Sequence, residues 1–123
     1  MLKTFKDLVV WQKAYQLCLN VYRITAPFPN EEKFRLTSQL RRAAVSIPSN
    51  IAEGYGRKTN PDSIKFLYVS YGSIREQETQ IMLAEDLGYM ENGPRQNVLN
   101  ITVEVERMLK GLITSLENTS STI

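Results

Sequence analysis

Apolar residues recur at intervals of three and four along most of the chain, which is the spacing of one face of an α-helix. The pattern predicts four helices, at about 7–25, 31–55, 61–87 and 94–117. Short segments rich in Pro, Gly and Asn separate the four helices, and no β-hairpin pattern competes with them. The tail at 118–123 is polar and is expected to fray.

Several residues mark the expected helix ends. Asp7 and Asn30 are suited to cap the first two helices, because short polar side chains accept hydrogen bonds from free backbone amides. Asn60 is the expected cap of the third helix, with Pro61 in its first turn, and Gly88 is the expected stop. Pro48 lies inside the second helix and is expected to kink or break it, since proline cannot donate to the carbonyl of residue 44.

Helices of this length joined by short connections lie antiparallel to their neighbours in the most economical arrangement. The sequence therefore predicts an all-α fold, an antiparallel up-down-up-down four-helix bundle, formed by 1–123 as a single domain.

Composition narrows the chemistry that such a bundle could perform. The 123 residues include no histidine and a single cysteine, Cys18. Catalytic Ser-His-Asp and Cys-His groups, histidine metal sites and an internal disulfide are therefore excluded. We expect no enzymatic activity, no catalytic residue, no metal and no cofactor. The chain also shows no signal peptide and no apolar segment of membrane-spanning length, so a cytoplasmic location is expected.

Charge is distributed unevenly along the chain. The formal net charge is +2, but residues 1–65 carry 11 basic and 5 acidic side chains, whereas residues 66–123 carry 4 and 8. The two parts therefore have net charges of +6 and −4. The candidate phosphate-binding residues, which lie on or directly after the second helix, are Arg35, Arg41, Arg42, Arg57 and Lys58. The alternative is that Arg41 and Arg42 pair with acidic residues of the third or fourth helix, within one chain or between subunits.

Polar residues also share faces of the second and third helices. They are Ser46, Asn50 and Glu53 on the second helix, and Ser73 with Glu76 or Gln77, and then Gln80, on the third. We call Ser46, Asn50, Glu53, Ser73 and Glu76 the polar seam. A hydrogen-bonded contact that fixes helix register is the favoured interpretation, because buried polar groups need partners. The alternative is a polar binding or catalytic cleft that would need Glu53 and Glu76 to converge.

Several motifs of the chain resemble those of a known family. They are FKDL at 5–8 with Trp11, QLRRAAVSI at 39–47, SNIAEGYGR at 49–57, Gly72 and Ser73 followed by Glu76, Glu78 and Gln80, and LGY at 87–89. Together they resemble the bacterial four-helix bundle proteins encoded by intervening sequences in 23S ribosomal RNA genes. The resemblance extends from about Phe5 to Leu116, and its most specific part is the run at 46–54. Gln77 stands where the family more commonly has an apolar residue.

The resemblance implies a short-looped bundle that assembles as a ring-shaped homopentamer. It also implies a similarity to the accessory protein of diversity-generating retroelements, which associates with nucleic acid and a reverse transcriptase. No enzymatic activity is implied. A reverse-transcriptase-like protein is thus an expected partner by analogy.

Two functions follow as hypotheses. The first is a non-enzymatic oligomeric module that binds RNA or DNA non-specifically through phosphates. The second is a protein–protein interaction scaffold with no role in nucleic-acid binding, in which the same basic residues pair with carboxylates at subunit contacts. In a homo-oligomeric ring, a basic surface of one subunit could meet an acidic surface of the next.

Overall fold

The computed structural model describes the backbone of residues 3–121 and the side chains of residues 3–119. Four α-helices span Val9–Thr25 (α1), Leu36–Tyr55 (α2), Asn60–Asp86 (α3) and Asn92–Ser121 (α4). Two short 3₁₀ turns, η1 at Phe5–Asp7 and η2 at Asn30–Glu32, precede α1 and α2. The described residues contain no β-strand. The prediction of an all-α protein with four helices is therefore confirmed.

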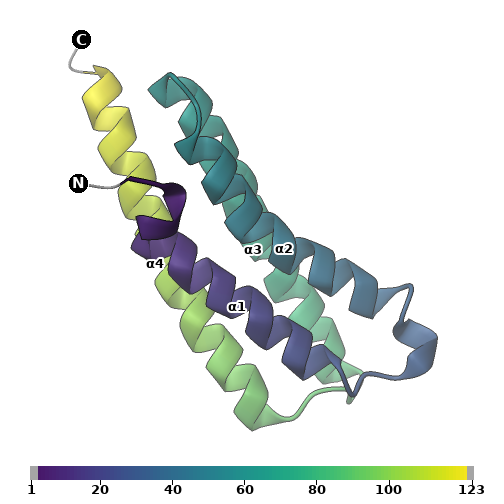
Figure 1. Cartoon of the computed structure of the whole chain (residues 1–123). Helices are drawn as coiled ribbons and strands as arrows, with labels where there is room; N and C mark the ends of the chain where they lie inside the picture. The colour runs from purple at the N-terminus through teal and green to yellow at the C-terminus, as the bar shows by residue number, and fades with distance from the viewer. Residues whose placement is uncertain (1–2, 122–123) are drawn as a thin grey trace.

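The helices pack side by side, each against two others (Figure 1). α1 packs against α2 and α4, and α3 packs against the same two helices. The most extensive of these contacts joins α2 to α3. No helix in the described part of the chain is both long and apolar enough to cross a membrane.

Apolar side chains from all four helices fill the centre of the bundle. Leu17 of α1, Ile47 of α2, Ile74 of α3 and Leu109 of α4 are fully buried. Ile47, Ile74 and Leu109 lie on the apolar stripes that the sequence pattern predicts, because a period of 3.6 places them on one face of each helix. The face of α1 predicted to be apolar, with Tyr15 and Tyr22, is instead partly exposed, and Leu17 lies on the neighbouring, buried face.

The first two helices begin later than predicted. Asp7 does not cap α1; it closes a capping box with Thr4 around η1, and α1 starts at Val9. The region at 31–35, predicted to be helical, includes the end of η2, and α2 starts at Leu36. The carboxylate of Glu32 accepts a hydrogen bond from the Leu36 amide at 3.4 Å, which satisfies one free donor at the start of α2.

The start of α3 differs from the prediction, and its end agrees with it. Thr59, not Asn60, caps the helix by accepting from the Asp62 amide at 3.3 Å. The Asn60 side chain donates instead to the carbonyl of Leu116 on α4. After α3, Gly88 adopts a left-handed φ of 79° and the Tyr89 amide donates to Ala84, so the predicted stop at Gly88 is confirmed.

α2 continues through Pro48 without a break. The buried Ser70 hydroxyl of α3 donates to the carbonyl of Ile47, directly before the proline, at 2.8 Å. This contact and the long packing surface with α3 support α2 where its own hydrogen-bond ladder lacks a donor. The segment predicted as a fraying tail, 118–123, is helical to Ser121, and its last two residues lie outside the described residues.

Candidate functional site

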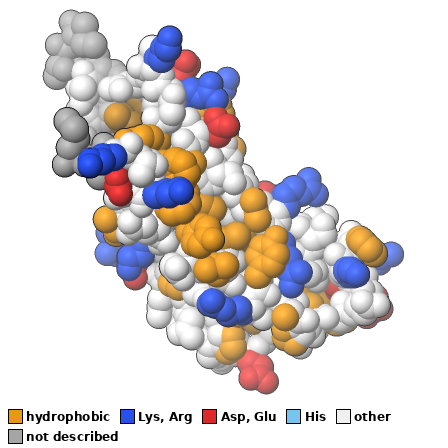
Figure 2. Space-filling model, viewed as in Figure 1, with side chains coloured by type: hydrophobic (Ala, Val, Ile, Leu, Met, Phe, Trp, Pro, Cys, Tyr) orange, Lys and Arg blue, Asp and Glu red, His pale blue; other side chains and the backbone are white. Residues whose placement is uncertain are grey.

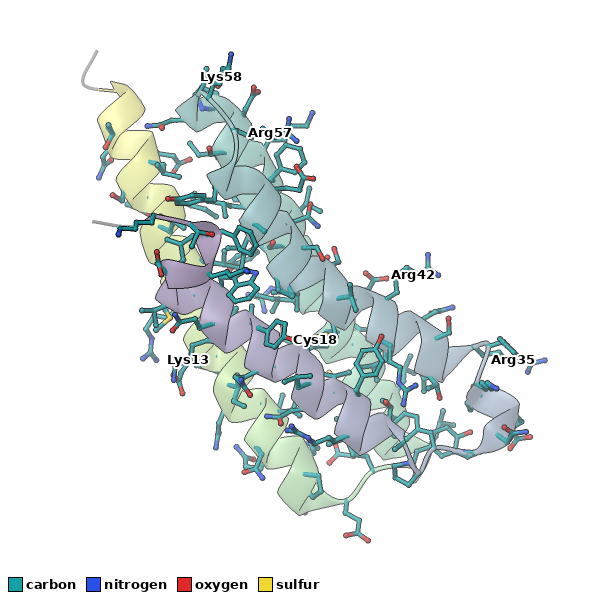
Figure 3. The ribbon with its side chains drawn as sticks, in the orientation of Figure 1. Lys13, Cys18, Arg35, Arg42, Arg57 and Lys58 are labelled. Atoms are coloured by element: carbon teal, nitrogen blue, oxygen red, sulfur yellow. The ribbon has the colours of Figure 1, made fainter. Side chains whose placement is uncertain are left out.

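The five candidate phosphate-binding residues do not form one cluster. Arg35 and Arg42 lie at one end of α2, and Arg57 and Lys58 lie at the other, as Figure 3 shows. The fifteen residues from Arg42 to Arg57 correspond to about 22 Å along a helix. A polyanion that contacts both groups on one chain must therefore run along α2.

Arg41 is used for contacts within the chain. Its Nε donates to the Thr25 hydroxyl at 2.8 Å, and Nη2 donates to the Tyr22 carbonyl at 3.3 Å. Its guanidinium also lies over the Tyr22 ring, 4.7 Å from the centroid. Arg41 therefore joins α2 to the last turn of α1, where a positive charge complements the free carbonyls of the helix end.

The side chains of Arg42 and Arg35, unlike that of Arg41, have no partner in the described chain. Both are exposed, and neither side chain forms a hydrogen bond or ion pair with a described residue. Figure 3 shows Arg42 pointing away from the bundle. These two cations are therefore available to an external anion.

At the other end of α2, one cation has an intrachain partner among the described residues and the other does not. Arg57 donates to the carboxylate of Glu53 at 2.5 Å and lies 4.5 Å from the centroid of the Phe66 ring. Lys58 is exposed and makes no ion pair within the described chain. Arg57 and Glu53 are one helical turn apart and exposed. Their ion pair therefore stabilises the fold weakly, by about 0.5 kcal/mol.

Acidic residues of α3 and α4 do not pair with Arg41 or Arg42 within the described chain. They pair with other cations: Glu104 with Lys13 at 2.8 Å, Glu85 with Arg95 at 2.7 Å, and Glu106 with Arg75 at 3.0 Å. The intrachain form of the alternative proposed for Arg41 and Arg42 is therefore wrong. Lys13 of α1, Arg75 of α3 and Arg95 of α4 are the partners of these carboxylates.

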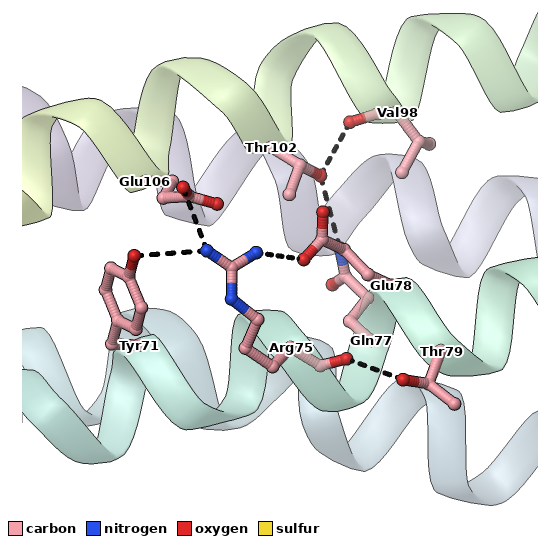
Figure 4. A network of polar contacts seen from close by, with 8 residues as sticks. All are labelled: Tyr71, Arg75, Gln77, Glu78, Thr79, Val98, Thr102 and Glu106. Atoms are coloured by element: carbon pink, nitrogen blue, oxygen red, sulfur yellow. Dashed lines mark hydrogen bonds and ion pairs between the residues drawn. The ribbon is translucent and has the colours of Figure 1, made fainter.

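Arg75 is the centre of the largest of these contacts (Figure 4). Its guanidinium pairs with Glu78 and Glu106 and donates to the Tyr71 hydroxyl at 3.1 Å. The hydrogen bonds to the two glutamates, and then to Tyr71, raise the pKa of Arg75 above its ordinary value. Arg75 was not among the residues predicted from the sequence, although its spacing of three and four from Glu78 and Tyr71 is the signal that could have identified it.

Part of the polar seam forms as predicted. The Ser73 hydroxyl donates to the Ser46 hydroxyl at 2.8 Å, and the Asn50 amide donates to the Ser46 carbonyl and hydroxyl at 2.9 and 3.0 Å. Glu53 and Glu76 are exposed and do not join this network. The cavity beside Glu53, of about 590 Å³, is lined by residues of the last turns of α2 and by Gly56 and Arg57 directly after it, and Glu76 does not line it.

The buried polar residues of α3 do not include Glu76, and its neighbour Gln77 is buried in its place. Ser70, Ser73, Gln77 and Gln80 form a buried row between Leu67 and Ala84. The Gln77 amide donates to the Thr102 hydroxyl of α4 at 3.3 Å, and this contact is visible in Figure 4. The Oε1 atoms of Gln77 and Gln80 are buried without a partner among the described residues. The row is a packing contact between helices and lines neither the cavity beside Glu53 nor the one beside Trp11.

An apolar surface covers parts of α1 and α2. Figure 2 shows it as a large orange area with Lys and Arg side chains around it. A cavity of about 380 Å³ within this surface is lined by Phe5, Trp11, Tyr15, Cys18, Leu19, Val45, Pro48, Ser49 and Ala52. Burial raises the pKa of the half-buried Cys18 thiol, so the thiol is less reactive than an exposed one. Such a surface is suited to contact another macromolecule.

Among the described residues, no three Cys, Asp or Glu side chains are arranged to hold a metal ion. Of the five candidate phosphate-binding residues, Arg35, Arg42 and Lys58 are the exposed charges without an ion pair in the described chain.

Comparisons with known proteins identify the family and the fold of the chain. The family model described as 23S rRNA-intervening sequence protein matches residues 6–111. The crystal structure of a protein of unknown function from the S23 ribosomal protein family of Bacteroides thetaiotaomicron superposes with a TM-score of 0.77. The two chains are 21% identical, over 85% of this chain and 98% of that one, and at this identity the likeness concerns the fold alone. None of the curated proteins matches the chain.

Proposed function

The chain belongs to the 23S rRNA-intervening sequence protein family, and we propose that it is a non-enzymatic, homo-oligomeric bundle that binds RNA or DNA non-specifically through phosphates. Arg35, Arg42 and Lys58 are the groups proposed to contact the phosphates. Arg41 and Arg57 contribute charge from positions that intrachain contacts fix.

The observation that carries this proposal is the difference between the two charged parts of the chain. Half of the acidic side chains in 66–123, namely Glu78, Glu85, Glu104 and Glu106, are paired with cations of the same chain. Arg35, Arg42 and Lys58 have no such partners among the described residues. Unpaired cations along one helix favour binding of a polyanion, and the absence of a base-reading motif favours binding without sequence preference.

Paired charge variants test this proposal. The double variant Arg35→Gln/Arg42→Gln removes two positive charges from α2, and Arg107→Gln/Lys110→Gln removes two exposed positive charges from α4. Both variants lower the formal net charge from +2 to 0. We expect the first to weaken binding of a fluorescent RNA or DNA about ten-fold or more, and the second to change it little. Equal losses would contradict a defined site on α2.

We also propose that up-down-up-down bundles of this kind assemble into a pentameric ring. A ring contact joins two different surfaces. The apolar surface of α1 and α2 is a candidate for one of them. Val69, Glu76 and Leu83 are candidates for the other, since their seven-residue spacing places them on one exposed face of α3.

Light scattering after size exclusion tests the assembly. We expect five times the chain mass of 14.1 kDa. Leu83→Glu should reduce that mass, whereas Val103→Glu, at an equally exposed apolar position of α4, should not. A monomer at all concentrations would exclude the ring.

A scaffold without nucleic acid is the second candidate, and the large apolar surface favours it. In that case Arg35 and Arg42 would pair with carboxylates of a neighbouring subunit such as Glu76. A reverse-transcriptase-like protein is the kind of partner that the family resemblance implies. The paired charge variants separate the two candidates, because the scaffold predicts that Arg35→Gln/Arg42→Gln lowers the oligomer mass.

A further inference from the structure

Phe34 is the most exposed large apolar residue of the described chain. Its side chain is 85% accessible, and it lies between Lys33 and Arg35 in the turn that leads from η2 to α2. The Lys33 ammonium lies 5.4 Å from the centroid of the Phe34 ring. A phenyl ring held in solvent beside two cations contributes little to the core of this chain.

A second flat surface lies close to Phe34. The Tyr22 ring is 41% exposed and is covered on one side by the Arg41 guanidinium, at 4.7 Å. The hydrogen bonds from Arg41 to Thr25 and to the Tyr22 carbonyl hold that guanidinium in place. A fixed guanidinium plane can stack on a nucleobase in the same way as an aromatic ring.

These groups surround one hollow of about 510 Å³. Its lining residues are Tyr22, Lys33, Phe34, Thr37, Ser38, Arg41, Arg42 and Val45. The volume lies within the range of small-ligand sites, about 300–1,000 Å³. No carboxylate lines the hollow. The carboxylate of Glu32, next to Lys33 in the chain, accepts hydrogen bonds from the Tyr89 hydroxyl at 2.8 Å and from the Leu36 amide.

We propose that this hollow binds single-stranded nucleic acid, with one base stacked on Phe34 and another on the Tyr22–Arg41 pair. Lys33, Arg35 and Arg42 contact the adjoining phosphates. This inference rests on the proposed function and narrows its ligand. Bases in a duplex are stacked on one another, so their faces are not available to Phe34, whereas an unpaired strand can offer them to aromatic side chains.

Binding to a labelled oligothymidine of about 20 nucleotides and to a duplex of the same length tests the inference. We expect tighter binding of the single strand. Phe34→Ala should weaken single-strand binding at least about five-fold, since stacking on one aromatic side chain contributes that much, and should leave duplex binding nearly unchanged. Phe34→Trp should retain single-strand binding because it keeps the stacking surface.

Tyr68→Ala is the matched control. Tyr68 is an exposed aromatic residue of α3 that does not line the hollow, so its removal should not affect single-strand binding. A strand that contains 5-iodouracil should form a photochemical crosslink to a peptide containing Phe34 or Tyr22.

The outcomes separate this inference from the proposed function. Absence of salt-sensitive binding to either nucleic acid would overturn both. Equal binding of single strand and duplex, unaffected by Phe34→Ala, would overturn the stacking site and leave phosphate binding in place. A lower oligomer mass for Phe34→Ala with unchanged single-strand binding would overturn the site too, because Phe34 would then be a subunit contact.

Discussion

The guanidinium of Arg41 lies over the ring of Tyr22, 4.7 Å from its centroid, and joins the start of α2 to the end of α1. Arg42, the next residue, is exposed and has no side-chain partner among the described residues. Two adjacent arginines thus have different roles, because successive residues of a helix point about 100° apart.

Arg41→Ala should therefore lower the free energy of unfolding by about 1–2 kcal/mol, through loss of two hydrogen bonds and a cation–π contact. Arg42→Ala should change it by less than about 0.5 kcal/mol, as is usual for an exposed residue. Urea denaturation measures both. Equal stability of the two variants would show that the Arg41 contacts contribute nothing to the α1–α2 packing.

At Gly54 the backbones of α2 and α3 approach closely, and a side chain there would crowd α3. A Cβ added there would lie 3.1 Å from the carbonyl oxygen of Ser63, whose hydroxyl donates to the Gly54 carbonyl at 2.7 Å. Gly54→Ala should destabilise the protein by about 1–2 kcal/mol. At Gly72, a Cβ would point into open space, so Gly72→Ala should stabilise the protein by about 0.5–1 kcal/mol because alanine favours the helix more than glycine does. Thermal melts of the two variants should shift in opposite directions.

Gln77 places an unpaired carbonyl oxygen in the core. Gln77→Met has a similar size and removes that oxygen, and Thr102 keeps its own hydrogen bond to the Val98 carbonyl at 2.7 Å. We expect the free energy of unfolding to rise by about 1 kcal/mol. Gln77→Ala, which leaves a cavity, should lower it by about 2 kcal/mol. Loss of stability in Gln77→Met would instead indicate that the amide of Gln77 is fully hydrogen-bonded in solution.

Tyr89 should give the protein a dependence on alkaline pH. Its hydroxyl donates to the Glu32 carboxylate at 2.8 Å. This bond, then partial burial and the charges of Glu32 and Glu31, raise the pKa of Tyr89 above its ordinary value of 10.0. The protonated form is favoured in the folded state, so its stabilisation is complete below the ordinary pKa and is lost as the pH rises through the raised one.

Denaturation of the protein and of Tyr89→Phe at about pH 9 and about pH 11 measures this effect. The protein should lose more stability over this interval than the variant, which lacks the titrating hydroxyl. Parallel losses in the two proteins would exclude a contribution from Tyr89.

The sequence predicted the helices well because their apolar stripes are long and regular. It was less accurate at helix starts. Thr59 and Asn60 are both suited to cap α3, and in the structure Thr59 does so while the Asn60 side chain donates to Leu116 of α4. The prediction that Glu76 belongs to the polar seam was wrong, because a shift of one residue rotates a helical side chain by about 100°. Gln77, the alternative at that level, faces the core.

The binding residues were harder to predict. Their residue types pointed to phosphate, but whether an arginine is free depends on which side chains the fold brings beside it. Arg41 donates to Thr25, sixteen residues away. Phe34 is an ordinary apolar position in the sequence pattern, and only the fold shows that it is exposed. Such contacts are set by tertiary packing and leave no local pattern in the sequence.

The dependence of nucleic-acid affinity on salt concentration tests the central claim most directly. If Lys33, Arg35, Arg42 and Lys58 each neutralise one phosphate of a single strand, log K should fall with log salt at a slope of about −2.8 per chain. The slope of the Arg35→Gln/Arg42→Gln variant should be reduced to about −1.4, and that of Arg107→Gln/Lys110→Gln should stay near −2.8. A flat dependence, or no binding at about 50 mM salt, would contradict the claim that these cations bind phosphates.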